Sequence, residues 1–146
     1  MHEYSIKMLR VVDGDTVDVD IDLGFGVWLR KQRIRLYGID TPESRTSDEI
    51  EKVYGLAAKE FLKKWTNSGD LRMRTHKDAK GKFGRILGEL HYNNVNINEK
   101  MIEENHAVKY HGQSKEAIAE EHIANRAKVE INMADLSDLI PGATGK

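Results

Sequence analysis

Apolar and polar residues alternate along the first forty positions with the period of two that is typical of strands with one buried and one solvated face. The clearest run covers residues 16–23. Its aliphatic residues, expected on the buried face, are Val17, Val19, Ile21 and Leu23, and its aspartates, expected in solvent, are Asp18, Asp20 and Asp22. With residues 4–12 and 27–39 on either side and a turn at residues 24–26, this run predicts three consecutive long strands.

After residue 45 the spacing of apolar residues changes to that of a helix. Thr46 and Glu49 have the spacing of a capping box, which predicts a helix start at Thr46. The apolar residues that follow at helical spacing, before Gly69, are Ile50, Val53, Tyr54, Ala57, Phe61, Leu62 and Trp65. Residues 71–77 and 85–92 then predict two more strands joined by a Lys- and Gly-rich loop, and two further helices are expected near residues 97–102 and 114–129.

Five short strands with a helix after the third predict an α+β fold, a five-stranded OB-type β-barrel with three helices. This architecture commonly binds nucleic acids through one face. Residues 1–140 are expected to form a single domain and residues 141–146 a flexible tail. Trp28 and Trp65 are expected to pack in the core or barrel rather than to stack on bases.

Composition narrows the chemistry. The 146 residues include no Cys, which excludes a disulfide framework, a thiolate zinc site and a cysteine nucleophile. The formal net charge of -1 argues against a nucleic-acid binder held by bulk electrostatics. However, acids crowd residues 13–22 whereas bases crowd residues 30–35 and 72–85. An acidic pocket on a basic face suits a metal ion that must meet a phosphate.

The chain shows no sign of export or membrane insertion. Residues 1–10 lack the apolar run of a secretory signal, and no stretch approaches the ~18 consecutive apolar residues of a membrane span. We therefore expect a soluble, cytoplasmic protein with no membrane partner, and a barrel of this size is expected to work as a monomer.

Three short segments could carry chemistry. Asp13-Gly14-Asp15-Thr16 places carboxylates at a sharp turn, although taken alone it equally describes a simple hairpin. Lys82-Phe83-Gly84-Arg85 ends the basic loop with an arginine that can hold phosphate oxygens in a bidentate fork, although alone it describes a solvated hairpin.

The third segment, residues 35–43, carries one cation and two carboxylates at the end of a strand. Strict alternation sends Arg35 and Asp40 to opposite faces, so they converge only if the chain bends, for which Gly38 is the natural position. Pro42 keeps Thr41 extended. The competing interpretation is a salt-bridged sheet edge in which Asp40 or Glu43 caps a loop.

Taken together and in this order, the three segments resemble the staphylococcal nuclease family, which reads Asp-Gly-Asp-Thr, then Arg followed five residues later by Asp-Thr-Pro-Glu, then Tyr-Gly-Arg. The motifs cover residues 6–110, and the trailing helix fits by pattern only. The resemblance implies a calcium-dependent nuclease that cuts DNA or RNA, single-stranded and with little sequence preference, by in-line attack of water that leaves 3'-phosphate ends.

The resemblance also implies residue roles. By match to the family, the Ca²⁺ ligands would be Asp15, Asp40 and the backbone carbonyl of Thr41, the catalytic residues Arg35, Glu43 and Arg85, and the substrate-binding residues Lys82, Phe83 and Tyr110. Oxygen-only ligation is what Ca²⁺ takes. Glu43 would orient or deprotonate the attacking water, and these two roles stay open.

The chain departs from the family pattern in two places. Phe83 stands where the family usually has Tyr, and only Tyr110 can be matched to the family's two tyrosines in that later segment. His106 and His111 flank Tyr110 and are expected to face solvent rather than phosphate.

Several functional questions stay open. A non-catalytic OB module that binds nucleic acid or methylated peptides is the alternative function, against which the full set of acids and arginines argues. DNA and RNA are not distinguished. Because a cytoplasmic nuclease is hazardous, we expect either weak activity at low cytosolic calcium or a controlled setting, such as a virus that dismantles host DNA.

Overall fold

The computed structural model describes residues 2–67, 69–76, 86–129 and 131. The elements follow in the order β1 (Glu3–Asp13), β2 (Thr16–Gly24), β3 (Val27–Leu36), β4 (Ile39–Asp40), α1 (Glu49–Thr66), β5 (Leu71–His76), β6 (Ile86–Tyr92), β7 (Val95–Asn96), α2 (Ile97–Glu103), β8 (Val108–Lys109) and α3 (Lys115–Arg126). The predicted tail at residues 141–146 lies outside the described residues.

Five strands close into a barrel. The sheet order is β3-β2-β1-β5-β6-β7 with antiparallel neighbours, and β3 also pairs in parallel with β6 from Ile34–Ile86 to Leu36–Gly88. A Cβ on Gly88 would lie 2.6 Å from Ile34 Cγ2, so the absence of a side chain lets the two strands meet at this seam. The α+β fold with an OB-type barrel and three helices is confirmed.

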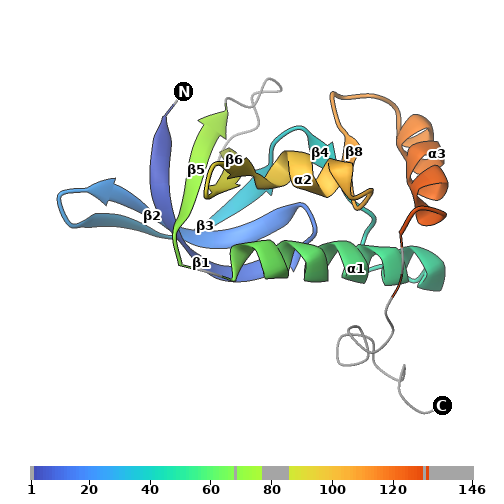
Figure 1. The fold of residues 1–146 in the computed structure, drawn as a ribbon, viewed down its shortest axis with the longest axis horizontal. Helices are drawn as coiled ribbons and strands as arrows, with labels where there is room; N and C mark the ends of the chain where they lie inside the picture. The colour runs from blue at the N-terminus through green and yellow to red at the C-terminus, as the bar shows by residue number, and fades with distance from the viewer. Residues whose placement is uncertain (1, 68, 77–85, 130, 132–146) are drawn as a thin grey trace, which may run out of the picture.

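The helices lie on one side of the barrel and at one end of it (Figure 1). α1 runs along β1, α2 lies against β6 and α1, and α3 stands beside the small β4–β8 pair. The barrel core is aliphatic and includes Val17, Val19, Ile34, Leu36, Leu62, Met73, Leu90 and Met101. None of the described helices is long and apolar enough to cross a membrane.

The strict alternation expected along β2 is wrong beyond Val19. The pairing of β2 with β3 shifts register between Val19 and Ile21, which is the signature of a bulge. Asp20 is therefore buried at 5% exposure, where its carboxylate accepts the Lys31 N–H at 2.9 Å and pairs with Arg30 at 2.9 Å. The hydrogen bond from the Lys31 backbone, assisted by Arg30, holds the pKa of Asp20 below its ordinary value against the opposing effect of burial.

Two further expectations are corrected at solvent-facing positions. Leu23 is 47% exposed and Trp28 37% exposed, because the β2–β3 hairpin projects beyond the barrel, whereas Trp65 packs against the core as expected.

The cap of α1 is Asp48 rather than Thr46, since the Asp48 carboxylate accepts the N–H groups of Ile50 and Glu51.

Candidate active site

Asp15 lies in the tight turn between β1 and β2, with Asp13 paired to Thr16 across it. A Cβ on Gly14 would lie 2.8 Å from Ala58 Cβ on α1 and 3.0 Å from Thr41 Oγ1, so only glycine lets the turn approach both. The Asp15 carboxylate accepts the Thr41 N–H at 3.2 Å and the Thr16 hydroxyl at 3.0 Å. The turn is thus more than a simple hairpin, because it brings Asp15 to the segment that follows β4.

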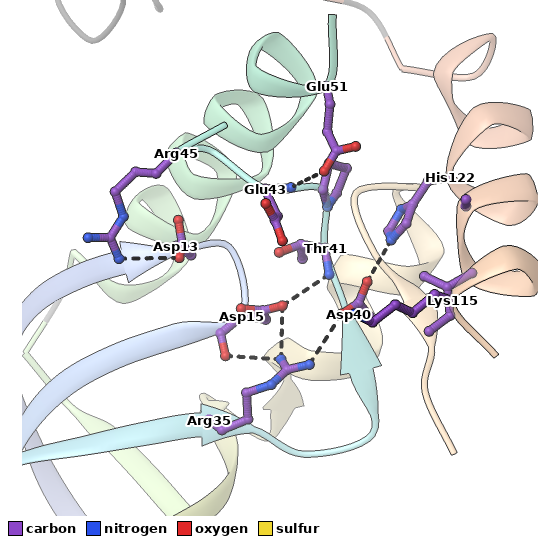
Figure 2. A pocket seen from close by; sticks show the side chains of 13 residues that line it. Asp13, Asp15, Arg35, Asp40, Thr41, Glu43, Arg45, Glu51, Lys115 and His122 are labelled. Carbon is purple, nitrogen blue, oxygen red and sulfur yellow. Dashed lines mark hydrogen bonds and ion pairs between the residues drawn. The ribbon is translucent and has the colours of Figure 1, made fainter. Parts of the chain in front are cut away.

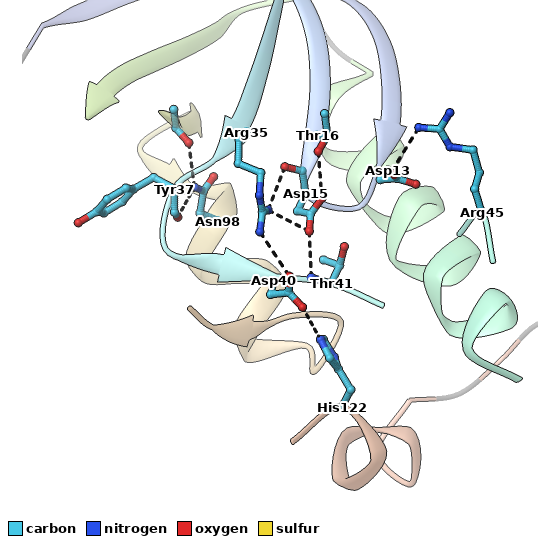
Figure 3. A network of polar contacts seen from close by, with 11 residues as sticks. Asp13, Asp15, Thr16, Arg35, Tyr37, Asp40, Thr41, Arg45, Asn98 and His122 are labelled. Atoms are coloured by element: carbon cyan, nitrogen blue, oxygen red, sulfur yellow. Dashed lines mark hydrogen bonds and ion pairs between the residues drawn. The ribbon is translucent and has the colours of Figure 1, made fainter. Parts of the chain in front are cut away.

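Arg35 and Asp40 converge because the chain bends between them. β3 ends at Leu36, Gly38 takes a left-handed φ of 77°, and β4 restarts at Ile39. Arg35 Nη1 lies 2.9 Å from Asp15 Oδ2, and Arg35 Nη2 lies 3.3 Å from Asp40 Oδ1 (Figures 2 and 3). The predicted strand over residues 27–39 is therefore broken, and the bend predicted at Gly38 is confirmed.

Asn98 of α2 stabilises the bend after β3 through hydrogen bonds to the backbone. This residue is 3% exposed. Its amide nitrogen donates to the carbonyls of Tyr37 at 2.9 Å and Gly88 at 3.1 Å, and its amide oxygen accepts the Leu90 N–H at 3.1 Å. A buried amide with its groups satisfied is rigid. Asn98 thereby connects the end of β3 to the closing strand β6 (Figure 3).

The segment that carries Thr41 and Glu43 is pressed against α1. A Cβ on Gly55 would lie 2.3 Å from the Glu43 carbonyl oxygen and 2.6 Å from the Ser44 nitrogen. The Glu43 N–H donates to Glu51 Oε2 at 3.1 Å. The Glu43 side chain is exposed and lines the pocket, and Thr41 is buried at 5% exposure. Packing against the helix therefore sets the position of Glu43.

Asp13 contacts the loop that follows β4. Its carboxylate accepts the Ser44 hydroxyl and lies 3.6 Å from Arg45 Nη2. These contacts tie Asp13 to the loop after β4, so it shapes the rim while Asp15 and Asp40 face Arg35 (Figure 3).

The third helix completes the site and supplies a residue that the sequence did not indicate. His122 Nε2 lies 2.8 Å from Asp40 Oδ2, and the His122 side chain is only 11% exposed. An ionised carboxylate can only accept, so the imidazole N–H donates to it. The residues that α3 contributes to the pocket recur at one-face helical spacing: Lys115, Ile118, Ala119 and His122. The available signal was a histidine at the same helical spacing as Lys115, Ile118 and Ala119.

These residues line an open pocket of about 700 Å³ at the junction of the β1–β2 turn, β4, α1 and α3 (Figure 2). Its acidic side chains are Asp13, Asp15, Asp40, Glu43 and Glu51, and its basic ones are Arg35, Arg45 and Lys115. The mixture of charges is what a metal ion together with a phosphate would require.

Of the four remaining predicted site residues, the structure describes only Tyr110. Lys82, Phe83 and Arg85 lie outside the described residues. Tyr110 is next to the cluster, with its ring centre 5.9 Å from the Arg35 guanidinium carbon and its N–H donated to the Gly38 carbonyl at 2.8 Å.

The two flanking histidines differ from each other. His111 is exposed as expected. His106 is partly buried, and its ring lies 4.6 Å from that of Phe61, so the expectation that it faces solvent is wrong. Burial lowers the pKa of His106, which keeps the ring neutral and unsuited to a phosphate contact.

The donor chemistry of the pocket fits a hard cation. Asp15 and Asp40 offer carboxylate oxygens, and Thr41 Oγ1 beside them is buried without a hydrogen-bond partner. Among the residues that the structure describes, no three His, Cys, Asp or Glu side chains group as a metal site. A site made of the Asp15 and Asp40 carboxylates, one backbone carbonyl and water has fewer than three such side chains, so it is compatible with that finding.

Comparison with known proteins gives a consistent result. The family model described as "Staphylococcal nuclease homologue" matches residues 33–132. The chain is 32% identical over 103 residues to "Thermonuclease" of Staphylococcus hyicus, covering 70% of this chain and 57% of that protein. The protein of the same name from Staphylococcus intermedius is 34% identical over 101 residues, covering 69% and 55%.

A Bacillus relative extends the comparison. "Endonuclease YncB" of Bacillus subtilis (strain 168) is 30% identical over 101 residues, which cover 68% of this chain and 45% of that protein. The chain thus spans about half the length of these curated relatives.

Proposed function

This chain belongs to the staphylococcal nuclease family, and from that membership and the geometry of its pocket we propose that it is a calcium-dependent nuclease. The observation that carries the proposal is the pair of carboxylates, Asp15 and Asp40, held 2.9 and 3.3 Å from one arginine inside an open pocket with Glu43 at its edge. Its substrates are DNA or RNA strands, with single strands preferred.

The ion would be held by Asp15, Asp40 and the backbone carbonyl of Thr41. When bound, Ca²⁺ would supply charge neutralisation at a phosphate oxygen and lower the pKa of water in its vicinity. The Thr41 N–H donated to Asp15 and the His122 N–H donated to Asp40 leave each carboxylate fixed in orientation. Hydrogen bonds of this kind to metal ligands raise both affinity and positional precision.

The chain's own groups perform the remaining steps. Glu43 orients the attacking water or accepts its proton. The water oxygen forms a bond to phosphorus as the bond to the 5'-oxygen breaks. The leaving 5'-oxygen takes up a proton from solvent or from an arginine N–H beside it, which leaves a 3'-phosphate and a 5'-hydroxyl. Arg35, fixed by its carboxylate partners, directs N–H donors at the charge that builds on the phosphoryl oxygens. Arg85 is expected to provide the second guanidinium, and Lys82, Phe83 and Tyr110 to hold the rest of the nucleotide.

Cleavage of heat-denatured DNA in calcium, in magnesium and in chelator tests the proposal, with Glu43→Gln as the site variant. Glu49→Gln is the matched control, because Glu49 is also an acid near the start of α1 but does not line the pocket. We expect calcium-dependent cutting that Glu43→Gln reduces by about 10²–10⁴-fold and Glu49→Gln leaves intact. Folded protein that binds DNA without cutting it in calcium would instead establish the non-catalytic binding module.

A further inference from the structure

Two recesses extend from the active-site pocket along α1. The pocket shares Arg45 with the first, which measures about 510 Å³, and the first shares Lys59 with the second, which measures about 640 Å³. The second recess lies between α1 and β1, which run along each other (Figure 1). Because Arg45 stands at the edge of the pocket (Figure 2), the three hollows follow one another from the site along the helix.

The charged residues that line the two recesses are nearly all basic. Among the described lining residues Glu60 is the one acid. The bases, which we call the α1 track, are Arg10, Arg45, Lys52, Lys59, Lys63 and Lys64. Lys52, Lys59 and Lys63 are seven and four residues apart on α1, so they lie on one face of the helix over about 16 Å.

Two members of the α1 track have acids nearby. The Arg45 guanidinium lies 3.6 Å from the Asp13 carboxylate, but its side chain is still 68% exposed, which leaves N–H donors for a ligand. Arg10 is the cross-strand partner of Asp18. The Asp18 carboxylate is already hydrogen-bonded by Arg33 at 2.9 and 3.2 Å. These acids therefore neutralise only part of the charge of the track.

The lysines at the middle of the α1 track have still less compensation. In the part of the chain that the structure describes, neither Lys59 nor Lys63 forms an ion pair. Burial lowers the pKa of Lys59, and the charge of Lys63 lowers it further. Arg10 and Arg45 act in the same direction, and Asp13 opposes them. A lysine surrounded by other cations lies in a positive field that a bound anion would relieve.

We propose that the α1 track holds the sugar-phosphate backbone of the substrate strand outside the pocket, with successive phosphates along the helix. This inference rests on the proposed nuclease function, because it extends the path of the substrate from that site. A strand carries regularly spaced negative charges, which match cations repeated along one helix face. Since the recesses continue from the pocket, one strand can occupy both.

The lining of the two recesses also favours phosphates over bases. No aromatic side chain is among the described residues that line them, so stacking on bases is absent there. Lysine contacts to phosphate carry no sequence information, and binding along the α1 track should therefore show little sequence preference. A local set of bases also explains how a chain of net charge -1 would hold a polyanion.

Fluorescence anisotropy tests the proposal with a labelled single strand of DNA of about 16 nucleotides, kept intact by chelator. At about 50 mM salt, Lys59→Gln with Lys63→Gln should weaken binding by about tenfold or more. The slope of log affinity against log salt should become shallower by about 1.4, since each lost phosphate contact removes about 0.7. Lys63→Gln alone should change the slope by about 0.7. An RNA strand of the same length should respond alike, because its phosphates carry the same charge.

The matched control is Lys7→Gln with Lys31→Asn. It also removes two exposed lysines, but neither residue lines the pocket or the recesses. Asparagine suits the left-handed φ of 52° at position 31. The control should bind as the native chain does, and circular dichroism checks that each variant is folded.

Native affinity and salt slope in the Lys59 and Lys63 variants, or an equal loss in the control, would overturn the proposal. Binding of a poly-glutamate peptide as tightly as DNA, with the same dependence on Lys59 and Lys63, would also overturn it and assign the surface to an acidic protein.

Cleavage kinetics separate this proposal from the proposed function. In calcium, the double variant should raise KM for the strand rather than lower kcat, because the α1 track binds the strand away from the reacting phosphate. Track-dependent binding without any cleavage would refute the nuclease and support the track. Cleavage with native KM and native affinity in the double variant would refute the track alone.

Discussion

Replacement of Gly55 by alanine tests whether α1 positions Glu43. The added Cβ would lie 2.3 Å from the Glu43 carbonyl oxygen and 2.4 Å from the carbonyl carbon. Both are backbone atoms that cannot rotate away, so the helix and the Glu43 segment must separate by about 1 Å to reach ordinary contact. Alanine gains about 1 kcal/mol in helix propensity, whereas overpacking against backbone costs about 3 kcal/mol. The overpacking cost exceeds the propensity gain.

We therefore expect Gly55→Ala to lower the free energy of unfolding by about 2 kcal/mol, and a 1 Å shift of Glu43 to lower the cleavage rate by about 100-fold. Urea unfolding and cleavage of denatured DNA measure the two effects. Gly69→Ala is the control, because no atom lies within 4 Å of its Cβ position and its φ is not left-handed. A Gly55→Ala protein that cuts at the native rate would refute the idea that this contact places Glu43.

Three further predictions concern single side chains. Arg35→Lys should reduce kcat/KM for cleavage by about 10²-fold or more, because one ammonium cannot replace a fork that reaches two carboxylates; near-native kinetics would contradict this. His122→Ala should weaken Ca²⁺ binding, measured by calorimetry, by about tenfold or more through loss of its hydrogen bond to Asp40, whereas Ile123→Ala on the same helix should not. His106 has a lowered pKa in the folded chain, so its neutral form favours folding above the unfolded pKa of about 6.5, and stability should fall below that pH by at most about 1.4 kcal/mol per unit. His106→Gln should flatten this part of the curve of unfolding free energy against pH, and an unchanged slope would contradict the assignment.

The parts of the fold that could be predicted from sequence are those in which one local rule dominates. Alternation in residues 16–19 identified β2, and helical spacing in residues 50–66 identified α1. In both segments apolar residues recur with the period of the element that they form. The conflict between alternation and the charges of Arg35 and Asp40 also had a single local solution, a bend at Gly38.

The parts that could not be predicted depend on partners distant in sequence or on a change of register. Asp20 is buried because a bulge changes which side of the strand it faces, and its partner is the backbone of Lys31 eleven residues later. On α1, Ile50 belongs to the run of apolar residues at helical spacing but is 60% exposed. The buried face of the helix includes Gly55 and Ala58, where close packing needs small residues. Hydrophobicity alone does not reveal such a face.

His122 shows the same limit at the site. It reaches Asp40 across 82 residues of sequence, and nothing in the local pattern of either segment requires the other. The face of α3 that reaches the pocket is visible in sequence as a spacing, but the identity of the facing element comes only from the packing of α3 beside β4 and β8.

The charge balance of the cluster favours one of the two interpretations of residues 35–43. A purely structural salt bridge is favourable when its charges cancel and its groups are well packed, because uncompensated charge in a partly buried site is costly. Here two carboxylates, 14% and 27% exposed, share one guanidinium that is 19% exposed, and Glu43 adds a third carboxylate to the same pocket. The excess of negative charge has no structural benefit in itself, but it is what a divalent cation would neutralise. This balance supports our proposal that the cluster is a site for a cation and a phosphate rather than a salt-bridged edge.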